Sequence, residues 1–236
     1  AFINGINTIA VEIHQVNQTS SDLSFRLELL GLSANSTFNS SSADLSLNSC
    51  SEILWAGLYW GSTLGGSSDN SWRTGHTSVL FKIPGAASYT TVTSSQTDLH
   101  DSSAANNHTG YQSFADVTSL INATNGIGTY TIANVCSPVS TGKNNQAAGW
   151  ALVIVYRDPT TIPRNLVVFD GFEIVSVNTQ KDIPIAGFLT PLIGPVSCEL
   201  GAVCYDGDRV SADGWFFKQD SAVAGTYTNL SNAGTN

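Results

Sequence analysis

The side chains of this sequence best suited to chemistry form an acidic cluster. Asp206 and Asp208 flank a glycine, and Asp213 follows shortly after them. Carboxylates at alternate positions around a glycine can wrap Ca²⁺, which takes about six to eight oxygen ligands. The glutamate that would close an EF-hand loop is missing. The sequence predicts a Ca²⁺ site at these aspartates, and the alternative is a tight turn whose carboxylates bond the backbone.

Four cysteines form the second group with possible chemistry: Cys50, Cys136, Cys198 and Cys204. They include no CxxC pair, and no histidine stands at zinc-finger spacing from them. An even cysteine count in a chain rich in Ser, Thr and Asn is typical of an oxidising compartment. We therefore expect two disulfides, Cys50–Cys136 between distant strands and Cys198–Cys204 around a short loop. The alternative is four reduced, buried thiols.

The sequence contains none of the common catalytic motifs considered next. It has no GxSxG elbow and no HExxH. His76, His100 and His108 lie in polar stretches too far apart in sequence to suggest a triad. A glycosidase needs two carboxyls about 5–9.5 Å apart across a sugar site, and the few glutamates suggest no such pair. We expect this protein not to be an enzyme.

Aromatic side chains offer flat faces to sugar rings. Trp60 and Trp72 flank a loop rich in Gly and Ser, which makes them the candidates for glycan contact. The alternative is that they seal the end of a folded domain. Trp55 and Trp150 stand in apolar stretches and are expected in the core.

Sequons for asparagine-linked glycosylation recur along the chain. In a sequence so rich in Asn, Ser and Thr, most of them are expected by chance. The candidate acceptors are Asn17, Asn35, Asn39, Asn107, Asn122 and Asn229.

Composition limits the classes of protein that can position these groups. The 236 residues are 42% hydrophobic but only 11% charged, and the net charge is −9. Such an acidic chain lacks the basic footprint of a nucleic-acid binder and the charge that anionic membranes attract. No apolar run reaches the roughly 18–20 residues of a membrane-spanning helix. A hydroxyl-rich, sparsely charged surface is typical of extracellular or cell-surface proteins.

Short runs of β-branched and aromatic residues, separated by Gly, Asn, Ser and Pro, dominate the chain. They predict an all-β fold, an antiparallel β-sandwich of jelly-roll type with little helix. The apolar run 151–155 should form a central strand covered on both faces, and residues 116–124 are the helix candidate, capped by Asp116. Predicted strands are 8–16, 23–30, 43–47, 52–60, 78–83, 90–93, 110–116, 128–133, 149–156, 164–177, 182–185, 196–203 and 215–218.

A series of motifs in a characteristic order covers about three-quarters of the chain. It includes EILWAGLYW at residues 52–60, FKIPG at 81–85, AGWALVIVY at 148–156 and FDGF at 169–172. Over residues 38–217 the sequence resembles a β-sandwich module of very large secreted surface and adhesin proteins of Bacteroidetes-type bacteria. This resemblance implies a place and an architecture more than an activity.

The first thirty residues resemble something else, the closing strands of galactose-binding-like jelly rolls. We therefore divide the chain into an N-terminal strand segment, residues 1–30, and a β-sandwich domain, residues 31–236. In the segment, Ile9, Val11 and Ile13 share one face of an alternating strand. The chain begins with what resembles a closing strand and ends before its own. The segment is thus expected to complete either its own sandwich or that of a neighbour.

These features support two hypotheses of function. The first is an extracellular structural or adhesive surface protein, the repeating subunit of a head-to-tail filament assembled by strand donation. The second is a Ca²⁺-dependent carbohydrate-binding module of a secreted protein, based on the acidic cluster and the loop aromatics. The expected partners are further copies of the chain or glycans, and the only expected cofactor is Ca²⁺.

Overall fold

The computed structural model describes residues 37–64, 75–101, 108–122, 126–137, 146–175, 179–190, 192–194, 196–205, 214–218 and 227–230. The chain divides into two units, residues 1–36 and residues 37–236. The first unit, which includes the predicted strands 8–16 and 23–30, lies outside the described residues.

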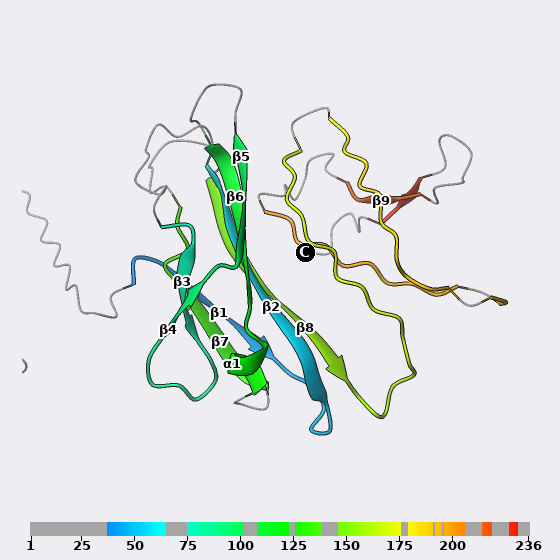
Figure 1. Cartoon of the computed structure of the whole chain (residues 1–236), viewed down its shortest axis with the longest axis horizontal. Coiled ribbons are helices and arrows are strands. Elements are labelled where there is room, and N and C mark those ends of the chain that lie inside the picture. Colours follow the sequence, from blue (N-terminus) through cyan, green and yellow to red (C-terminus); the bar gives the residue numbers. More distant parts are fainter. Residues whose placement is uncertain are drawn as a thin grey trace, which may run out of the picture. The chain divides into compact units, whose positions relative to one another are not determined.

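Eight strands of the second unit form two antiparallel four-stranded sheets (Figure 1). The first sheet has the order β1-β7-β3-β4, with β1 (Ser40–Leu45), β7 (Gly128–Ala133), β3 (Ser78–Lys82) and β4 (Thr90–Thr93). The second has the order β5-β6-β2-β8, with β5 (Gln96–Asp101), β6 (His108–Asp116), β2 (Glu52–Leu64) and β8 (Gln146–Arg157). The predicted all-β sandwich is confirmed, whereas its jelly-roll subtype stays a prediction.

The core lies between the two sheets, because alternate residues of each strand point inward. Trp60, Tyr111, Phe81 and Tyr130 are its largest fully buried side chains. Their polar atoms are satisfied: the Trp60 indole nitrogen donates to a backbone carbonyl at 3.0 Å, and the Tyr111 hydroxyl donates to another at 2.7 Å. Buried aromatics with paired polar groups make this region a well-packed core.

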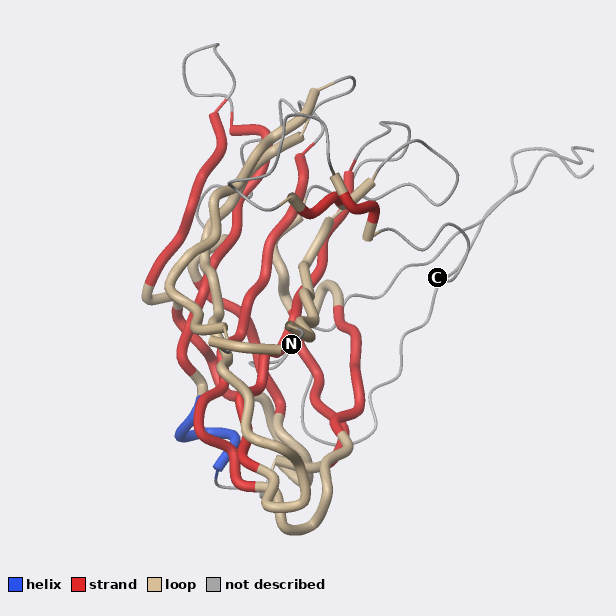
Figure 2. Tube along the Cα trace, turned by 90° about the vertical axis from the view of Figure 1, so that its right-hand side faces the viewer, coloured by secondary structure: helices blue, strands red, loops and turns tan. Residues whose placement is uncertain are grey.

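A single short helix, α1 (Thr118–Asn122), appears among the described residues. Its predicted cap is confirmed, since the Asp116 carboxylate accepts a hydrogen bond from the Thr118 backbone nitrogen at 2.9 Å. Hydrogen bonds from Thr118 hold the pKa of this carboxyl below its ordinary value. Ile121 is fully buried and packs into the core. The helix lies beside the strands, toward one end of the sandwich (Figure 2).

The chain after β8 differs from the sequence prediction. Its described residues up to Tyr205 contain neither helix nor strand, and beyond them β9 (Phe216–Phe217) pairs with β10 (Thr228–Asn229). The strands predicted at 182–185 and 196–203, and at the described part of 164–177, are therefore wrong in this structure. Their β-forming side chains are mostly exposed, so no neighbouring strand or core selects the ladder that their propensity favours.

The position of β8 is a second correction. Its apolar run predicted a central strand, but β8 is the last strand of its sheet. All five residues of 151–155 are only partly buried. An unpredicted strand, β5, lies at the other end of the same sheet. Its residues, QTDLHD, are largely polar, which suits an edge position and explains why hydrophobic patterning missed it.

Candidate functional site

The two edge strands β1 and β8 border an apolar groove between the sheets. Within the described part of the chain, β1 pairs only with β7 and β8 pairs only with β2. Both therefore present a row of unpaired backbone groups, a template for another strand. The groove has a volume of about 400 Å³. We call it the edge groove; its lining residues are Ser42, Ala43, Asp44, Leu45, Tyr130, Trp150, Ala151 and Leu152.

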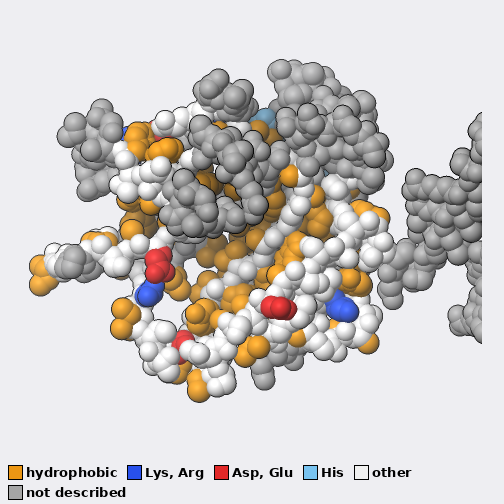
Figure 3. Space-filling view, turned by 180° about the vertical axis from the view of Figure 1, so that it is seen from behind, with side chains coloured by type: hydrophobic (Ala, Val, Ile, Leu, Met, Phe, Trp, Pro, Cys, Tyr) orange, Lys and Arg blue, Asp and Glu red, His pale blue; other side chains and the backbone are white. Residues whose placement is uncertain are grey.

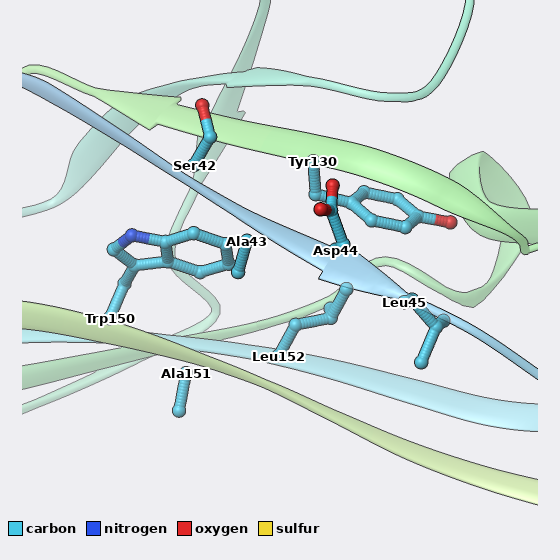
Figure 4. Close-up of a pocket in the computed structure, with 8 residues that line it drawn as sticks. All are labelled: Ser42, Ala43, Asp44, Leu45, Tyr130, Trp150, Ala151 and Leu152. Carbon is cyan, nitrogen blue, oxygen red and sulfur yellow. The ribbon is translucent and has the colours of Figure 1, made fainter.

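Side chains of β8 and β1 meet across the edge groove. Figure 4 shows Trp150 and Leu152 directed toward β1, whereas Ala151 points the other way. The Trp150 indole nitrogen donates to the Ser41 hydroxyl at 2.7 Å, which ties the two sheets together at one end of the groove. Leu152 and Leu45 are partly buried and pack against the core. The interior of the groove is thus apolar, with one polar bridge at its end.

The rim of the groove carries one charge, and that charge has a partner. The Asp44 carboxylate accepts a hydrogen bond from the Thr129 hydroxyl at 2.6 Å. The Ser42 and Thr131 hydroxyls share a hydrogen bond of 2.8 Å. No lining residue is a histidine, cysteine or lysine. Apolar pockets beside an unpaired strand edge suit the binding of an extended peptide, and they do not suit acid–base chemistry.

The outer face of the β8 sheet is unusually rich in glycine, and aromatic side chains rest on it. Gly61 and Gly149 are cross-strand partners. A Cβ atom at Gly149 would lie 3.0 Å from the Tyr205 ring, and one at Gly61 would lie 3.3 Å from it. Phe172 approaches another glycine of this face, where a Cβ atom would come within 3.2 Å. Glycines inside strands mark such close approaches, so part of the chain after β8 packs on this face.

Tyr205 is deeply set in this outer face. Burial raises its pKa to about 12. Its hydroxyl is buried without a hydrogen-bond partner, an arrangement that costs free energy. Tyr205 is therefore held by van der Waals packing of its ring on the glycines and not by a hydrogen bond of its hydroxyl. The chain after β8 is also fixed by a hydrogen bond from the Gln112 side chain to the Gly171 carbonyl at 3.2 Å.

Two carboxylates approach each other beside this face. Burial raises the pKa of Asp170, and repulsion from Asp98 raises it further. Asp170 in turn adds to the raised pKa of Tyr59, whose main cause is burial. No group of three or more metal-ligating side chains occurs among the described residues. The predicted Ca²⁺ ligands Asp206, Asp208 and Asp213 lie outside them.

The predicted Cys50–Cys136 disulfide is wrong for this fold. Cys50 stands just before Glu52, the first residue of β2. The Cys136 carbonyl accepts a hydrogen bond from the Tyr111 hydroxyl. Tyr111 is the cross-strand partner of Ser62, which lies near the far end of β2. At about 3.3 Å per residue, these ends are roughly 30 Å apart. A disulfide needs Cα atoms within about 7 Å. The sequence predicts that this pair joins two distant strands, but the fold brings the two cysteines to opposite ends of the sandwich.

The other predicted disulfide is not formed here either. In the described part of the chain no disulfide links any two cysteines. Cys198 and Cys204 are exposed, and the Cys204 sulfur contacts the neighbouring Tyr205 carbonyl at 3.8 Å. The Cys198–Cys204 bond stays a prediction.

The tryptophan predictions require correction. Trp60, a candidate for glycan contact, is fully buried and bonded to the His76 carbonyl, so it seals the core. Trp72 lies outside the described residues. Trp55, expected in the core, instead stacks on Phe114 with ring centroids 6.1 Å apart. It lies over Gly57 on the outer face, where a Cβ atom would collide with its ring.

Three of the six predicted glycosylation sites are described. The Asn39 side chain donates to the Val135 carbonyl at 2.7 Å and accepts from the Val135 nitrogen at 3.0 Å, so a glycan there would disturb an existing contact. Asn122 and Asn229 are exposed. The other three sites, and the predicted donor residues, lie outside the described residues: Asn17, Asn35, Asn107, Ile9, Val11 and Ile13.

Sequence reasoning missed the edge groove itself. Its residues are ordinary in type, and β1 lies beside β8 only because of the order of the strands in the two sheets and the way the sheets pack. The sequence does carry a sign of the outer face: Gly57, Gly61 and Gly149 interrupt strongly apolar strands, and such glycines point to close packing on one face. Figure 3 shows one side of the molecule, where hydrophobic side chains gather and charged ones are sparse.

Comparisons of this chain with protein-family models, with curated proteins and with solved structures found no match. No helix in the described part of the chain is long and apolar enough to cross a membrane.

Proposed function

We propose that this protein is an extracellular structural or adhesive surface protein whose copies assemble head to tail by strand donation. The observation that carries the proposal is the edge groove, where the edge strands of both sheets lie open beside an apolar interior. A strand added there gains main-chain hydrogen bonds from the edge and burial of alternate side chains from the groove. The sparse charge of the chain, 11%, is compatible with an extracellular surface.

The N-terminal segment is the proposed donor. Ile9, Val11 and Ile13 alternate with Ala10 and Glu12, so one face of the strand is apolar and the other carries the charge. Donation from one copy to the next uses two different surfaces. Such a contact need not close on itself, and it propagates into a filament.

The calcium-dependent carbohydrate-binding alternative has less support. Its acidic cluster lies outside the described residues, and one of its two candidate tryptophans, Trp60, is buried. No observation of the described residues favours it.

Deleting residues 1–16 tests the proposed function. Sedimentation velocity and electron microscopy of the full chain should show polymers. The truncated chain should be a folded monomer with the same near-ultraviolet circular dichroism, and it should bind an added peptide of residues 6–16. A peptide with the same composition in scrambled order is the control. A full chain that stays monomeric at every concentration would overturn the proposal.

A further inference from the structure

The two strands that border the edge groove are not equally suited to receive a donor. β1 has six residues, of which three are serine, and all but its last residue are exposed. β8 has twelve residues, and its apolar run of 151–155 is only partly buried although the strand is long. An apolar run of this kind is typical of a central strand, which has a neighbouring strand on each side. β8 has a neighbour on one side only, so its partly buried side chains and its unpaired backbone edge favour β8 as the receiving strand.

The inward positions of β8 match the apolar positions of the donor. Trp150, Leu152 and Ile154 are opposite Trp60, Leu58 and Ala56 of β2 in the sheet register. The three β2 residues are fully buried, so the three β8 residues point to the same interior. They recur at every second position, and so do the apolar residues of the donor segment.

The donor segment itself is chemically compatible with the groove. The stretch from Ile9 to Ile13, with Val11 between them, is five residues long, as is the stretch of β8 that holds its three inward residues. Two of the three are isoleucine and the third is valine, which fit a pleated, half-buried surface. Glu12, the only charged residue between positions 6 and 13, falls on the opposite face of the strand. Its carboxylate would stay in water, away from Asp44 on the rim.

The strongest competing occupant from the same chain is engaged elsewhere. The sequence of residues 164–175 has strong β propensity and follows β8 after six intervening residues. In the structure its Phe172 and Ile174 instead lie against Gly110 on the outer face of the sheet. Arg164, at its start, forms an ion pair of 3.2 Å with Glu199. These contacts leave the open edge of β8 to another segment.

We infer that the edge groove of one copy receives residues 6–13 of a second copy, paired with the open edge of β8. Ile9, Val11 and Ile13 then lie alongside Trp150, Leu152 and Ile154. This inference rests on the proposed function, because it names the partner and the receiving strand of the same assembly.

Filling the groove from the opposite strand tests the inference. Ala43 lines the groove but is exposed, so Ala43→Trp adds bulk there without removing a core side chain. We expect the concentration needed for assembly to rise about tenfold or more, equivalent to about 1.4 kcal/mol. Thr91→Trp is the matched control, because Thr91 is an exposed residue of β4 at the other edge of the same sheet. It should assemble like the wild type.

Photo-crosslinking identifies the occupant directly and does not depend on either variant. In the full chain, a benzophenone amino acid replaces Val153, the outward residue of β8 that stands between the inward residues Leu152 and Ile154. Equal amounts of ¹⁵N-labelled and unlabelled protein are mixed before assembly. Mass spectrometry should find crosslinks to residues 6–13 that join labelled to unlabelled chains. The same amino acid at Gln96, on the opposite edge strand β5, should not give them.

The outcomes separate the inference from the function beneath it. Polymers whose Val153 crosslinks map to another segment would overturn the inference and leave head-to-tail assembly in place. Crosslinks to residues 6–13 only within one chain would show a strand that folds back and would overturn donation as well. A chain that never polymerises would overturn the proposed function first.

Discussion

Residues 37–161 and residues 162–230 have similar β-forming sequences but reach different structures. The first region holds the eight strands of the sandwich and buries Trp60, Tyr111 and Phe81 completely. In the second, described residues form only one two-stranded ladder. Leu192 and Ile193 there are 101% and 89% exposed. The contrast shows that β propensity makes a strand only where a partner strand and a core complete it.

The regions also differ in how they are held. Six of the eight sandwich strands pair with a strand distant in sequence, whereas β4 and β5 pair only with the strand next to them in the chain. The inward side chains of the two sheets form one core. The second region contacts the first through separate points, such as Tyr205 on Gly149 and Gly61. It retains a large exposed apolar surface, which usually marks a surface for interaction. Stability should therefore be concentrated in the first region, and single substitutions should reveal the difference.

The largest expected effect is the loss of a core side chain. Trp60→Ala removes a fully buried indole and the hydrogen bond to the His76 carbonyl. The free energy of unfolding should fall by about 3–5 kcal/mol. Leu192→Ala, at an exposed position of the second region, should change it by about 0.5 kcal/mol or less. Urea denaturation of both variants measures the difference, and comparable losses would erase the contrast between the regions.

A smaller effect is expected where the second region rests on the first. Gly149→Val places side-chain atoms against the Tyr205 ring, so the ring should leave its cradle at a cost of about 1–3 kcal/mol. The sandwich should stay folded. The pKa of Tyr205, raised to about 12 by burial, should fall toward the ordinary value of about 10.

NMR titration of ¹³C-labelled tyrosine measures this pKa. Introducing Gly149→Val into a Tyr205→Ala background is the control. There the valine should cost less, because its partner ring is gone. An unchanged titration in the single variant would mean that the ring does not depend on the glycine.

The sequence predicted much of the first region and little of the second. Strands β4 and β7 begin and end where alternation and turn residues place them, and Asp116 caps the helix as expected. These features depend on local sequence. The edge position of β8 could not be predicted, because an apolar strand looks the same whether or not a second neighbour is present. The separation of Cys50 from Cys136 likewise depends on strand order.

Acid should act on the two regions in opposite directions. Hydrogen bonds from Thr160 and Asn48 lower the pKa of Asp158, which ends the sandwich region. Its stabilisation is therefore present above the ordinary pKa of about 3.9 and is lost as the pH falls through the lowered value. The pKa of Asp170 is raised, so its effect on stability depends on pH in the opposite direction. The contribution of Asp170 to stability is complete below the ordinary pKa of an aspartate and is lost as the pH rises through the raised pKa.

Thermal unfolding of Asp158→Asn and Asp170→Asn between pH 3 and pH 7 tests these signs. At pH 7 the first variant should be less stable than the wild type and the second slightly more stable. The difference for Asp170→Asn should shrink at pH 3, where the wild-type carboxyl with its raised pKa is protonated. The difference for Asp158→Asn should shrink less over this range, because the stabilisation by Asp158 is fully lost only as the pH falls through its lowered pKa. Since Asp170 is largely exposed, solvent screening should keep its effect below about 1 kcal/mol. A stabilised Asp158→Asn variant at pH 7 would contradict the hydrogen-bonding account.

The smallest effect is expected at the exposed ion pair of the second region. Arg164 and Glu199 are 3.2 Å apart, with most of both side chains in water. Glu199→Gln should change the free energy of unfolding by no more than about 0.5 kcal/mol. Urea denaturation at low and high salt checks this, and a loss above about 1 kcal/mol would show that this pair organises the second region.

Hydrogen exchange of β8 tests the central claim, donation of a strand to its open edge, most directly. The full chain is compared below and above the concentration at which it assembles, with the exchange of individual β8 amides followed by mass spectrometry and fragmentation. Amides of residues 146–157 that face the open edge should exchange quickly in the monomer and become protected in the polymer, while amides of β4 stay unchanged. Polymers in which the exchange of β8 is the same as in the monomer would contradict the account.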